Sequence, residues 1–289
     1  MGASWQDHPS WSITEEVSDA ASRDVASLLV DADAETLKAT RNAQLAAFTL
    51  SLIVLDALRQ AGLDMAGVAA VAGHSLGEYS ALVATGVLTI AEGGRLVAAR
   101  GEAMQAAANA APGTMAAVLG LGPHEVAQAC DGVEGAWVAN DNAPGQIVVA
   151  GTAAGVAKAA DQARRHGAKR VLALSVGGAF HSPLMASAQG ALDEALSLTT
   201  WGTCTWPVVA NVDATAHRQG WAPLLSAQLV APVRWRESLL ALPDLGVTTT
   251  LELGAGAELS GMVKRTNEAM VRAGVGRPDD LAEVAALRS

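Results

Sequence analysis

The stretch that decides the fold runs from Val68 to Tyr79 and reads VAAVAGHSLGEY. A short apolar run meets the pattern GHSLG at residues 73–77, and residues typical of a helix follow. A G-x-S-x-G pattern between a strand and a helix is typical of a nucleophilic serine on a sharp turn. Such a turn would lift the Ser75 hydroxyl above the sheet edge, beside the N–H groups of a helix N-terminus. An ordinary serine in a glycine-rich turn is the alternative interpretation.

Outward from this stretch, the chain alternates short apolar runs with helical patterns. Residues 68–72 are apolar throughout, so we expect a strand buried on both faces, as in a parallel sheet covered by helices. Helices are expected over residues 12–29 and 89–108, each opened by a capping box, at Ser12 and Thr89. The other expected helices are 34–60, 182–198, 224–230, 235–242 and 257–273, and the other expected strands are 207–211 and 247–253.

The pattern changes between residues 111 and 178. Strands are expected at 113–119, 136–139, 146–150 and 169–176, helices at 123–130 and 152–166, and a turn at 140–145. This β-α-β-β-α-β order is that of the ferredoxin-like unit. We therefore predict an α/β fold in which residues 1–110 and 179–289 form the core and residues 111–178 form an inserted ferredoxin-like α+β subdomain.

The composition and net charge argue against several classes of function. The 289 residues are 51% hydrophobic and 17% charged, a profile typical of a folded globular protein, and the net charge of −10 argues against nucleic-acid or anionic-membrane partners. The basic clusters at 164–170, 234–236 and 264–265 are interpreted as solvated surface. Cys130 and Cys204 are the only cysteines, which suits a reducing cytoplasm and indicates neither a disulfide framework nor a metal site. No secretory signal or membrane-spanning run is visible.

A serine nucleophile needs a base within hydrogen-bond reach. Of the six histidines, His181 lies between a strand and a helix, where sites of parallel sheets gather, and is the favoured base. His74 is expected to hold the turn rather than to act on Ser75. Asp141, Asp213 or a backbone carbonyl could orient the base, and the pattern alone leaves these alternatives open.

Arg100 stands out on an alanine-rich helical stretch 25 positions after Ser75. A solvated charge and a bidentate clamp for a carboxylate are both compatible with this position. Arginine performs the clamp better than lysine because its planar guanidinium matches a carboxylate.

Six blocks now carry a resemblance: GHSLGEYSALVATGVL, RLVAARGEAMQ, NAPGQIVVAG, GAFHSPLM, QLVAPVRW and LELGAGAELSGMVKR. In order and spacing they resemble the malonyl-CoA:acyl carrier protein transacylase family over nearly the whole chain. The resemblance implies a hydrolase-like α/β core with an inserted ferredoxin-like subdomain. It also implies transfer of a malonyl group from malonyl-CoA to the phosphopantetheine thiol of an acyl carrier protein, in fatty acid or polyketide biosynthesis. The coenzyme A thioester is a substrate, and no cofactor or metal is implied.

The resemblance also implies roles for individual residues. Ser75 matches the acylated nucleophile, His181 the base and Arg100 the arginine that binds the malonyl carboxylate. The others match positions that line the site: Leu76 as an oxyanion N–H donor, Gln228 through the main-chain carbonyl that orients the histidine, Asn211 near that histidine, and Phe180 in the form associated with malonyl selection.

The sequence departs from the family pattern at its start. The family begins with a buried strand and a loop resembling FPGQGSQ that supplies a second oxyanion amide, whereas this sequence starts at Met1 and Gly2, where the segment after that loop would begin. We therefore expect only the Leu76 donor among the residues given.

Two kinds of function are alternatives to malonyl transfer: a serine hydrolase or thioesterase, and a non-catalytic carrier-binding subunit. A monomer is expected, since nothing in the sequence demands an oligomer.

Overall fold

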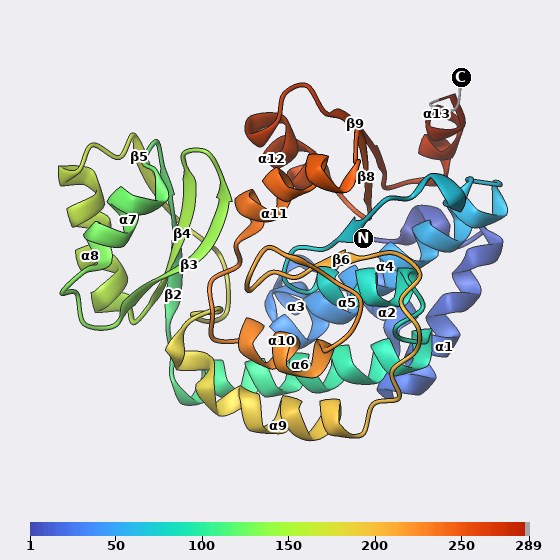
Figure 1. The fold of residues 1–289 in the computed structure, drawn as a ribbon. Coiled ribbons are helices and arrows are strands. Elements are labelled where there is room, and N and C mark those ends of the chain that lie inside the picture. The colour runs from blue at the N-terminus through green and yellow to red at the C-terminus, as the bar shows by residue number, and fades with distance from the viewer. Residues whose placement is uncertain (287–289) are drawn as a thin grey trace.

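Short strands followed by helices build the larger part of the chain, which lies beside a smaller α+β part in the computed structural model (Figure 1). The structure describes residues 1–286. The helices of the larger part are α1 (Ile13–Ala21), α2 (Val25–Val30), α3 (Ala34–Lys38), α4 (Thr40–Gln60), α5 (Gly77–Ala84), α6 (Ile90–Ala110), α9 (Ala186–Ser197), α10 (Trp221–Gln228), α11 (Trp235–Ala241), α12 (Glu258–Thr266) and α13 (Leu281–Ala286). Its strands are β1 (Val71–Ala72), β6 (Val208–Val209), β7 (Ala216–His217), β8 (Thr249–Leu253) and β9 (Val271–Val275).

The smaller part has the predicted order of elements. It comprises β2 (Thr114–Leu119), α7 (Pro123–Cys130), β3 (Ala136–Ala143), β4 (Gln146–Gly151), α8 (Ala153–Arg165) and β5 (Arg170–Ala173). The antiparallel sheet has the order β3-β4-β2-β5, which is the ferredoxin-like order. The predicted turn at 140–145 is shorter than expected, because β3 continues to Ala143 through two register shifts. From this arrangement we propose that residues 111–178 form the insertion and that residues 1–110 and 179–286 form the core; residues 287–289 of the predicted core lie outside the described residues.

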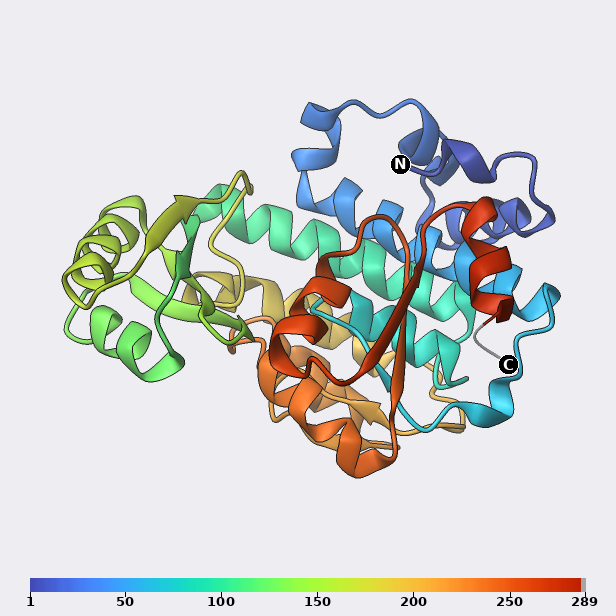
Figure 2. The same ribbon diagram turned by 90° about the horizontal axis from the view of Figure 1, so that it is seen from above.

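The core contains two long helices, α4 and α6. In Figure 2, α6 runs along the molecule, and it packs against α1, α4 and α9. Residues of α4 are buried on most sides, among them Leu45, Phe48 and Ile53. The dense apolar sequence of α4 is therefore explained by contacts on several faces, as predicted for a helix inside a large unit.

Several helix boundaries differ from those predicted. The helix expected over 12–29 is interrupted at Ser22, which has φ 51, and α2 restarts where the Asp24 side chain accepts from the Ser27 N–H. The helix expected over 34–60 is interrupted at Ala39, whose backbone is extended. Ser12 makes no capping hydrogen bond, so that capping box is wrong. Thr89 does cap α6, because its Oγ1 accepts from the Glu92 N–H at 3.0 Å.

The parallel pairs of the core occur as two separate sheets. One sheet has the order β1-β6-β7, with β1 and β6 parallel, and the other pairs β8 with β9 in parallel. β9 was not predicted, because the expected helix over 257–273 covered its start. The α/β class predicted from the sequence is nevertheless confirmed.

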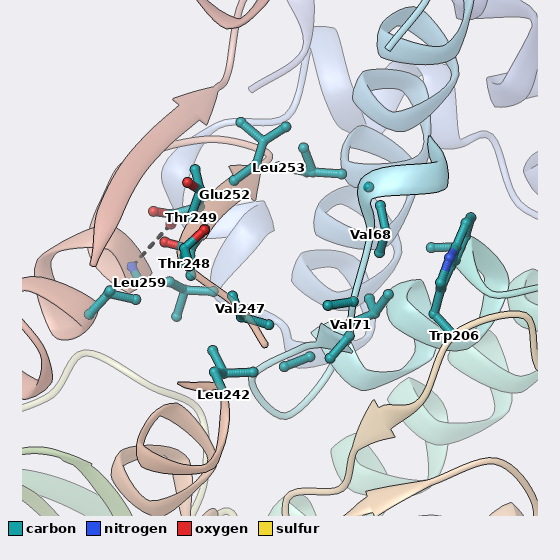
Figure 3. Close-up of a pocket in the computed structure, with 18 of the residues that line it drawn as sticks. Val68, Val71, Trp206, Leu242, Val247, Thr248, Thr249, Glu252, Leu253 and Leu259 are labelled. Atoms are coloured by element: carbon teal, nitrogen blue, oxygen red, sulfur yellow. Dashed lines mark hydrogen bonds between the residues drawn. The ribbon is translucent and has the colours of Figure 1, made fainter. Parts of the chain in front are cut away.

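A cavity of about 500 Å³ separates these sheets, and Figure 3 shows side chains from both edges lining it. Val68 and Val71 line it from one side and Val247 and Thr249 from the other. β1 and β8 are outer strands of their sheets, so residues 68–72 are only partly buried. The prediction that this run is buried on both faces is therefore wrong: the cavity lies where a neighbouring strand would cover it.

Candidate active site

The turn after β1 holds Ser75 in a left-handed conformation, with φ 51, before α5 begins at Gly77. A Cβ on Gly73 would lie 2.0 Å from the carbonyl carbon and oxygen of Gly77, so only glycine fits there. A Cβ on Gly77 would meet nothing within 4 Å. The sharp turn therefore depends on the first glycine of the pattern for space and on the strained serine for direction.

Asn211, which lies just after the neighbouring strand, holds this turn. It follows β6, which pairs with β1, and it is fully buried. Its Oδ1 accepts from the Ser75 N–H at 2.6 Å, and its Nδ2 donates to the Gly73 carbonyl at 2.8 Å. The Ser75 N–H is thus engaged, whereas the Leu76 N–H has no hydrogen-bond partner within residues 1–286.

His181 lies within hydrogen-bond reach of the nucleophile. Its Nε2 is 2.8 Å from the Ser75 Oγ, and its Nδ1 is 2.8 Å from the backbone carbonyl of Gln228. A carbonyl only accepts, so Nδ1 carries the proton and Nε2 is left to accept from the Ser75 hydroxyl. Burial, and then the positive charge of Arg100, lower the pKa of His181 to about 3. The imidazole is therefore neutral at neutral pH, the state that a general base requires.

Arg100 is buried next to the nucleophile, with 1% of its surface exposed. Its Nη2 donates to the Ser75 Oγ at 3.0 Å and to the Gln228 Oε1 at 2.9 Å, and its Nη1 donates to Gln44. The Tyr79 ring centroid lies 5.5 Å from the guanidinium carbon. No carboxylate forms an ion pair with Arg100 among the described residues, and burial lowers its pKa. A buried guanidinium without a carboxylate partner suits an anionic ligand, so the solvated-charge interpretation of Arg100 does not hold.

Gln44 was not identified from the sequence. It lies on α4 opposite Arg100, accepts from the guanidinium and donates to Thr40 Oγ1 at 2.8 Å. The two helices approach closely at Gly101, where a Cβ would lie 2.9 Å from the Arg41 Cα. A glutamine in a densely apolar helix was the available signal, because a buried amide needs hydrogen-bond partners.

The two aspartates considered as orienters have other partners. Asp141 accepts from Arg236 at 2.7 to 3.0 Å, and Asp213 pairs with His217 at 2.8 Å. The backbone carbonyl of Gln228 occupies the position against His181 that either would need.

The His74 side chain contacts residues other than Ser75. Its Nε2 is 2.8 Å from the Asn142 Oδ1, and its ring packs edge-on against Trp235. Phe180 precedes His181 and packs against apolar clusters of both the larger and the smaller part. Among residues 1–286, neither side chain forms a hydrogen bond with Ser75, so their effects on the site are indirect.

The described residues were compared with two other kinds of site, a metal centre and a membrane span. No group of three or more His, Cys, Asp or Glu side chains is placed to hold a metal ion among residues 1–286. Over the same residues, no helix combines the length and apolarity that a membrane crossing requires. The Arg164 and Arg234 side chains of the basic clusters pair with Asp161 and Glu237.

A serine on a strained turn, a neutral histidine and a buried arginine on an α/β core fit an enzyme that transfers acyl groups through a serine ester. The acyl transferase domain family matches residues 10–283, and the chain belongs to this family. Among curated relatives, the malonyl CoA-acyl carrier protein transacylase of Bacillus subtilis is 42% identical over 263 residues, which cover 89% of this chain and 82% of the relative. More particularly, then, the chain belongs to the malonyl-CoA:acyl carrier protein transacylase family.

Solved structures agree with this assignment. The acyl-carrier-protein-S-malonyltransferase of Bartonella henselae superposes with a TM-score of 0.91 at 38% identity, over 96% of this chain and 90% of that one. A malonyl-transacylase solved in complex with its type II polyketide synthase acyl-carrier protein has a TM-score of 0.93 at 33% identity, over 100% of this chain and 94% of that one. The chain is thus similar to its relatives over nearly its whole length.

Proposed function

We propose that this chain transfers a malonyl group from malonyl-CoA to the phosphopantetheine thiol of an acyl carrier protein, through a malonyl ester of Ser75. The observation that carries the proposal is the position of the Ser75 Oγ, 2.8 Å from the neutral His181 Nε2 and 3.0 Å from the Arg100 Nη2. A base and an unpaired cation meet at one hydroxyl. The base activates the hydroxyl, and the cation selects an acyl group that carries a carboxylate.

In the first half-reaction, the Ser75 Oγ attacks the thioester carbonyl carbon while its proton passes to His181 Nε2. The oxyanion so formed accepts a hydrogen bond from the Leu76 N–H. Collapse of this intermediate breaks the carbon–sulfur bond, and coenzyme A leaves as a thiol with the proton from His181. The product is malonyl-Ser75.

In the second half-reaction, His181 takes the proton of the phosphopantetheine thiol. The sulfur attacks the ester carbonyl, the oxyanion again faces the Leu76 N–H, and the carbon–oxygen bond to Ser75 breaks. Ser75 recovers its proton from His181. The catalytic groups in these steps all belong to one chain, so we propose a monomer that needs no cofactor. The two free cysteines, Cys130 and Cys204, suit a reducing compartment, and we propose that the protein acts in the cytoplasm.

Arg100 supplies the selectivity in this scheme. The carboxylate of a malonyl group lies one methylene beyond the reacting carbon, within the reach of a guanidinium that contacts the Ser75 Oγ. Burial is the main cause of the lowered pKa of His181, and pairing of Arg100 with the carboxylate would offset the smaller contribution of the positive charge. A malonyl group therefore makes its own base stronger, whereas an acetyl group leaves Arg100 buried and unpaired. Phe180, at the junction of the two parts, is proposed to shape the acyl pocket.

The test is intact-protein mass spectrometry after incubation with malonyl-CoA, with the Ser75→Ala variant as the control. A malonyl adduct on Ser75 that disappears on addition of holo-acyl carrier protein, with malonyl-carrier formed, supports the transferase. Release of free malonate instead would indicate a hydrolase. Carrier binding without any adduct on folded protein would indicate a non-catalytic subunit, and either result overturns the proposal.

A further inference from the structure

Glu78 is a buried carboxylic acid that the proposed reaction does not use. It lies in the first turn of α5, three residues after the nucleophile, and is 1% exposed. A glutamate at this place on a helix is usually solvated and stabilised by the helix dipole. Burial instead raises the pKa of Glu78 to about 7. A group that costs free energy to bury needs an explanation, and its contacts give one.

A single oxygen of Glu78 serves two residues of the site. Its Oε2 accepts from the Gln228 Nε2 at 2.7 Å and from the Asn211 backbone N–H at 3.2 Å. The Oε1 has no partner among the described residues. Within the described part of the chain, the hydrogen bonds of the Glu78 side chain therefore go to Gln228 and Asn211 alone.

The contact with Glu78 is one of three that fix which way the Gln228 side-chain amide points, together with those to the Ser75 carbonyl and the Arg100 guanidinium. Because Glu78 Oε2 accepts, it selects the NH2 end, which also donates to the Ser75 carbonyl at 3.0 Å. The Oε1 end is then left facing the Arg100 Nη2 at 2.9 Å. A reversed amide would place an NH2 group against the guanidinium, where two donors meet. The backbone carbonyl of the same residue holds His181.

The contact with Asn211 supports the other half of the site. The Asn211 N–H donates to Glu78, and its side chain binds the Ser75 N–H and the Gly73 carbonyl. We propose that Glu78 is a positioning residue, whose Oε2 fixes Gln228 and Asn211 and thereby aligns Arg100, His181 and the Ser75 turn with one another. This inference rests on the proposed function.

The test compares Glu78→Gln, which keeps an acceptor, with Glu78→Leu, which removes it. Single-turnover loading of Ser75 is measured with malonyl-CoA and with acetyl-CoA, and Glu16→Leu, an exposed first-turn glutamate of α1, is the control. We expect Glu78→Leu to load malonyl at least about tenfold more slowly and to lose about tenfold in malonyl-over-acetyl preference, since hydrogen bonds to charged groups carry such factors. Glu78→Gln should stay within about threefold of the parent in both, because a neutral acceptor remains.

Glu78→Asp provides a second variant if Glu78→Leu does not fold. Its carboxylate is one methylene shorter and cannot reach both donors, so we expect the same loss of preference with the charge retained. Equal preference in the parent, Glu78→Asp and Glu78→Leu would overturn the inference, as would a Glu78→Gln defect as large as that of Glu78→Leu. Failure of the parent protein to load Ser75 would instead count against the proposed function.

Discussion

Ser75 and His181, whose Oγ and Nε2 atoms lie 2.8 Å apart, both have left-handed backbones, with φ 51 and φ 57. Only four non-glycine residues of the described chain have a positive φ, and two of them are this pair. Such conformations cost free energy for residues with a Cβ and persist where the surrounding structure enforces them. The strain therefore coincides with the hydrogen bond on which the chemistry depends.

The first prediction concerns this strain. Replacing Ser75 by glycine removes the left-handed penalty, whereas replacing it by alanine keeps the Cβ. We expect Ser75→Gly to have a free energy of unfolding about 1 kcal/mol higher than that of Ser75→Ala. Urea unfolding of the two inactive variants measures the difference, and equal midpoints would show that the turn is unstrained.

The second prediction concerns the buried guanidinium. Arg100→Ala removes the cation that faces the Ser75 Oγ, so malonyl loading should fall while acetyl loading is retained. We expect malonyl-over-acetyl preference to drop about 10- to 100-fold, the range for a charge-assisted hydrogen bond. Competitive loading from an equal mixture of the two thioesters measures it. Arg100→Lys should recover only part of the preference, because lysine lacks the planar fork.

The third prediction separates the orienter of His181 from the nearby acids. Asp141→Asn weakens the pair with Arg236, which should lower the free energy of unfolding by about 1–3 kcal/mol. It should leave the loading rate of Ser75 unchanged, because His181 is held by the Gln228 carbonyl. Asp213→Asn should likewise leave the loading rate of Ser75 unchanged. A large loss of the Ser75 loading rate in either variant would show that the aspartate takes part in orienting His181.

The fourth prediction concerns pH and stability. The folded protein holds the proton of Glu78 more tightly than the unfolded chain, with a pKa of about 7 against 4.5. The folded state therefore binds more protons between these values, so this group lowers stability as pH rises from about 4.5 to 7 and no further above that. Between pH 4.5 and 8, the parent should lose about 3 kcal/mol more than Glu78→Gln. Denaturant titrations of both proteins at the two pH values measure this difference.

The fifth prediction concerns pH and rate. A histidine of ordinary pKa, 6.5, would be about nine-tenths protonated at pH 5.5 and would slow loading about tenfold. The pKa of His181 is lowered to about 3, so it remains a neutral base in this range. We therefore expect protonation of His181 to change the pre-steady-state loading rate less than about threefold between pH 7.5 and 5.5. A tenfold decline that persists in Glu78→Gln would contradict it.

Part of the site was predictable because short stretches of sequence indicate it. The GHSLG run predicted Ser75, and the position of His181 between a strand and a helix predicted a base near it. Arg100 was ambiguous from spacing alone, because a helix does not reveal which of its faces is buried. The orienter was equally open, since a backbone carbonyl such as that of Gln228 has no sequence signal of its own.

Other features depend on contacts between distant segments. The burial of Glu78 could not be predicted, because its partners are 133 and 150 positions away along the chain. β9 was missed since its residues, VRAGV, follow a helix and form a strand only beside β8. The exposure of residues 68–72 could not be predicted from their apolar composition, because it depends on what lies beyond the strand edge.

The cavity between the β1 and β8 edges offers a route by which the native protein could aggregate on heating. Outer strands can pair with extended segments of other molecules, and apolar side chains flank this opening. Loss of the native protein by that route is a bimolecular event. The apparent melting temperature would then fall as concentration rises, and the recovery on cooling would fall with it, even at a constant free energy of unfolding.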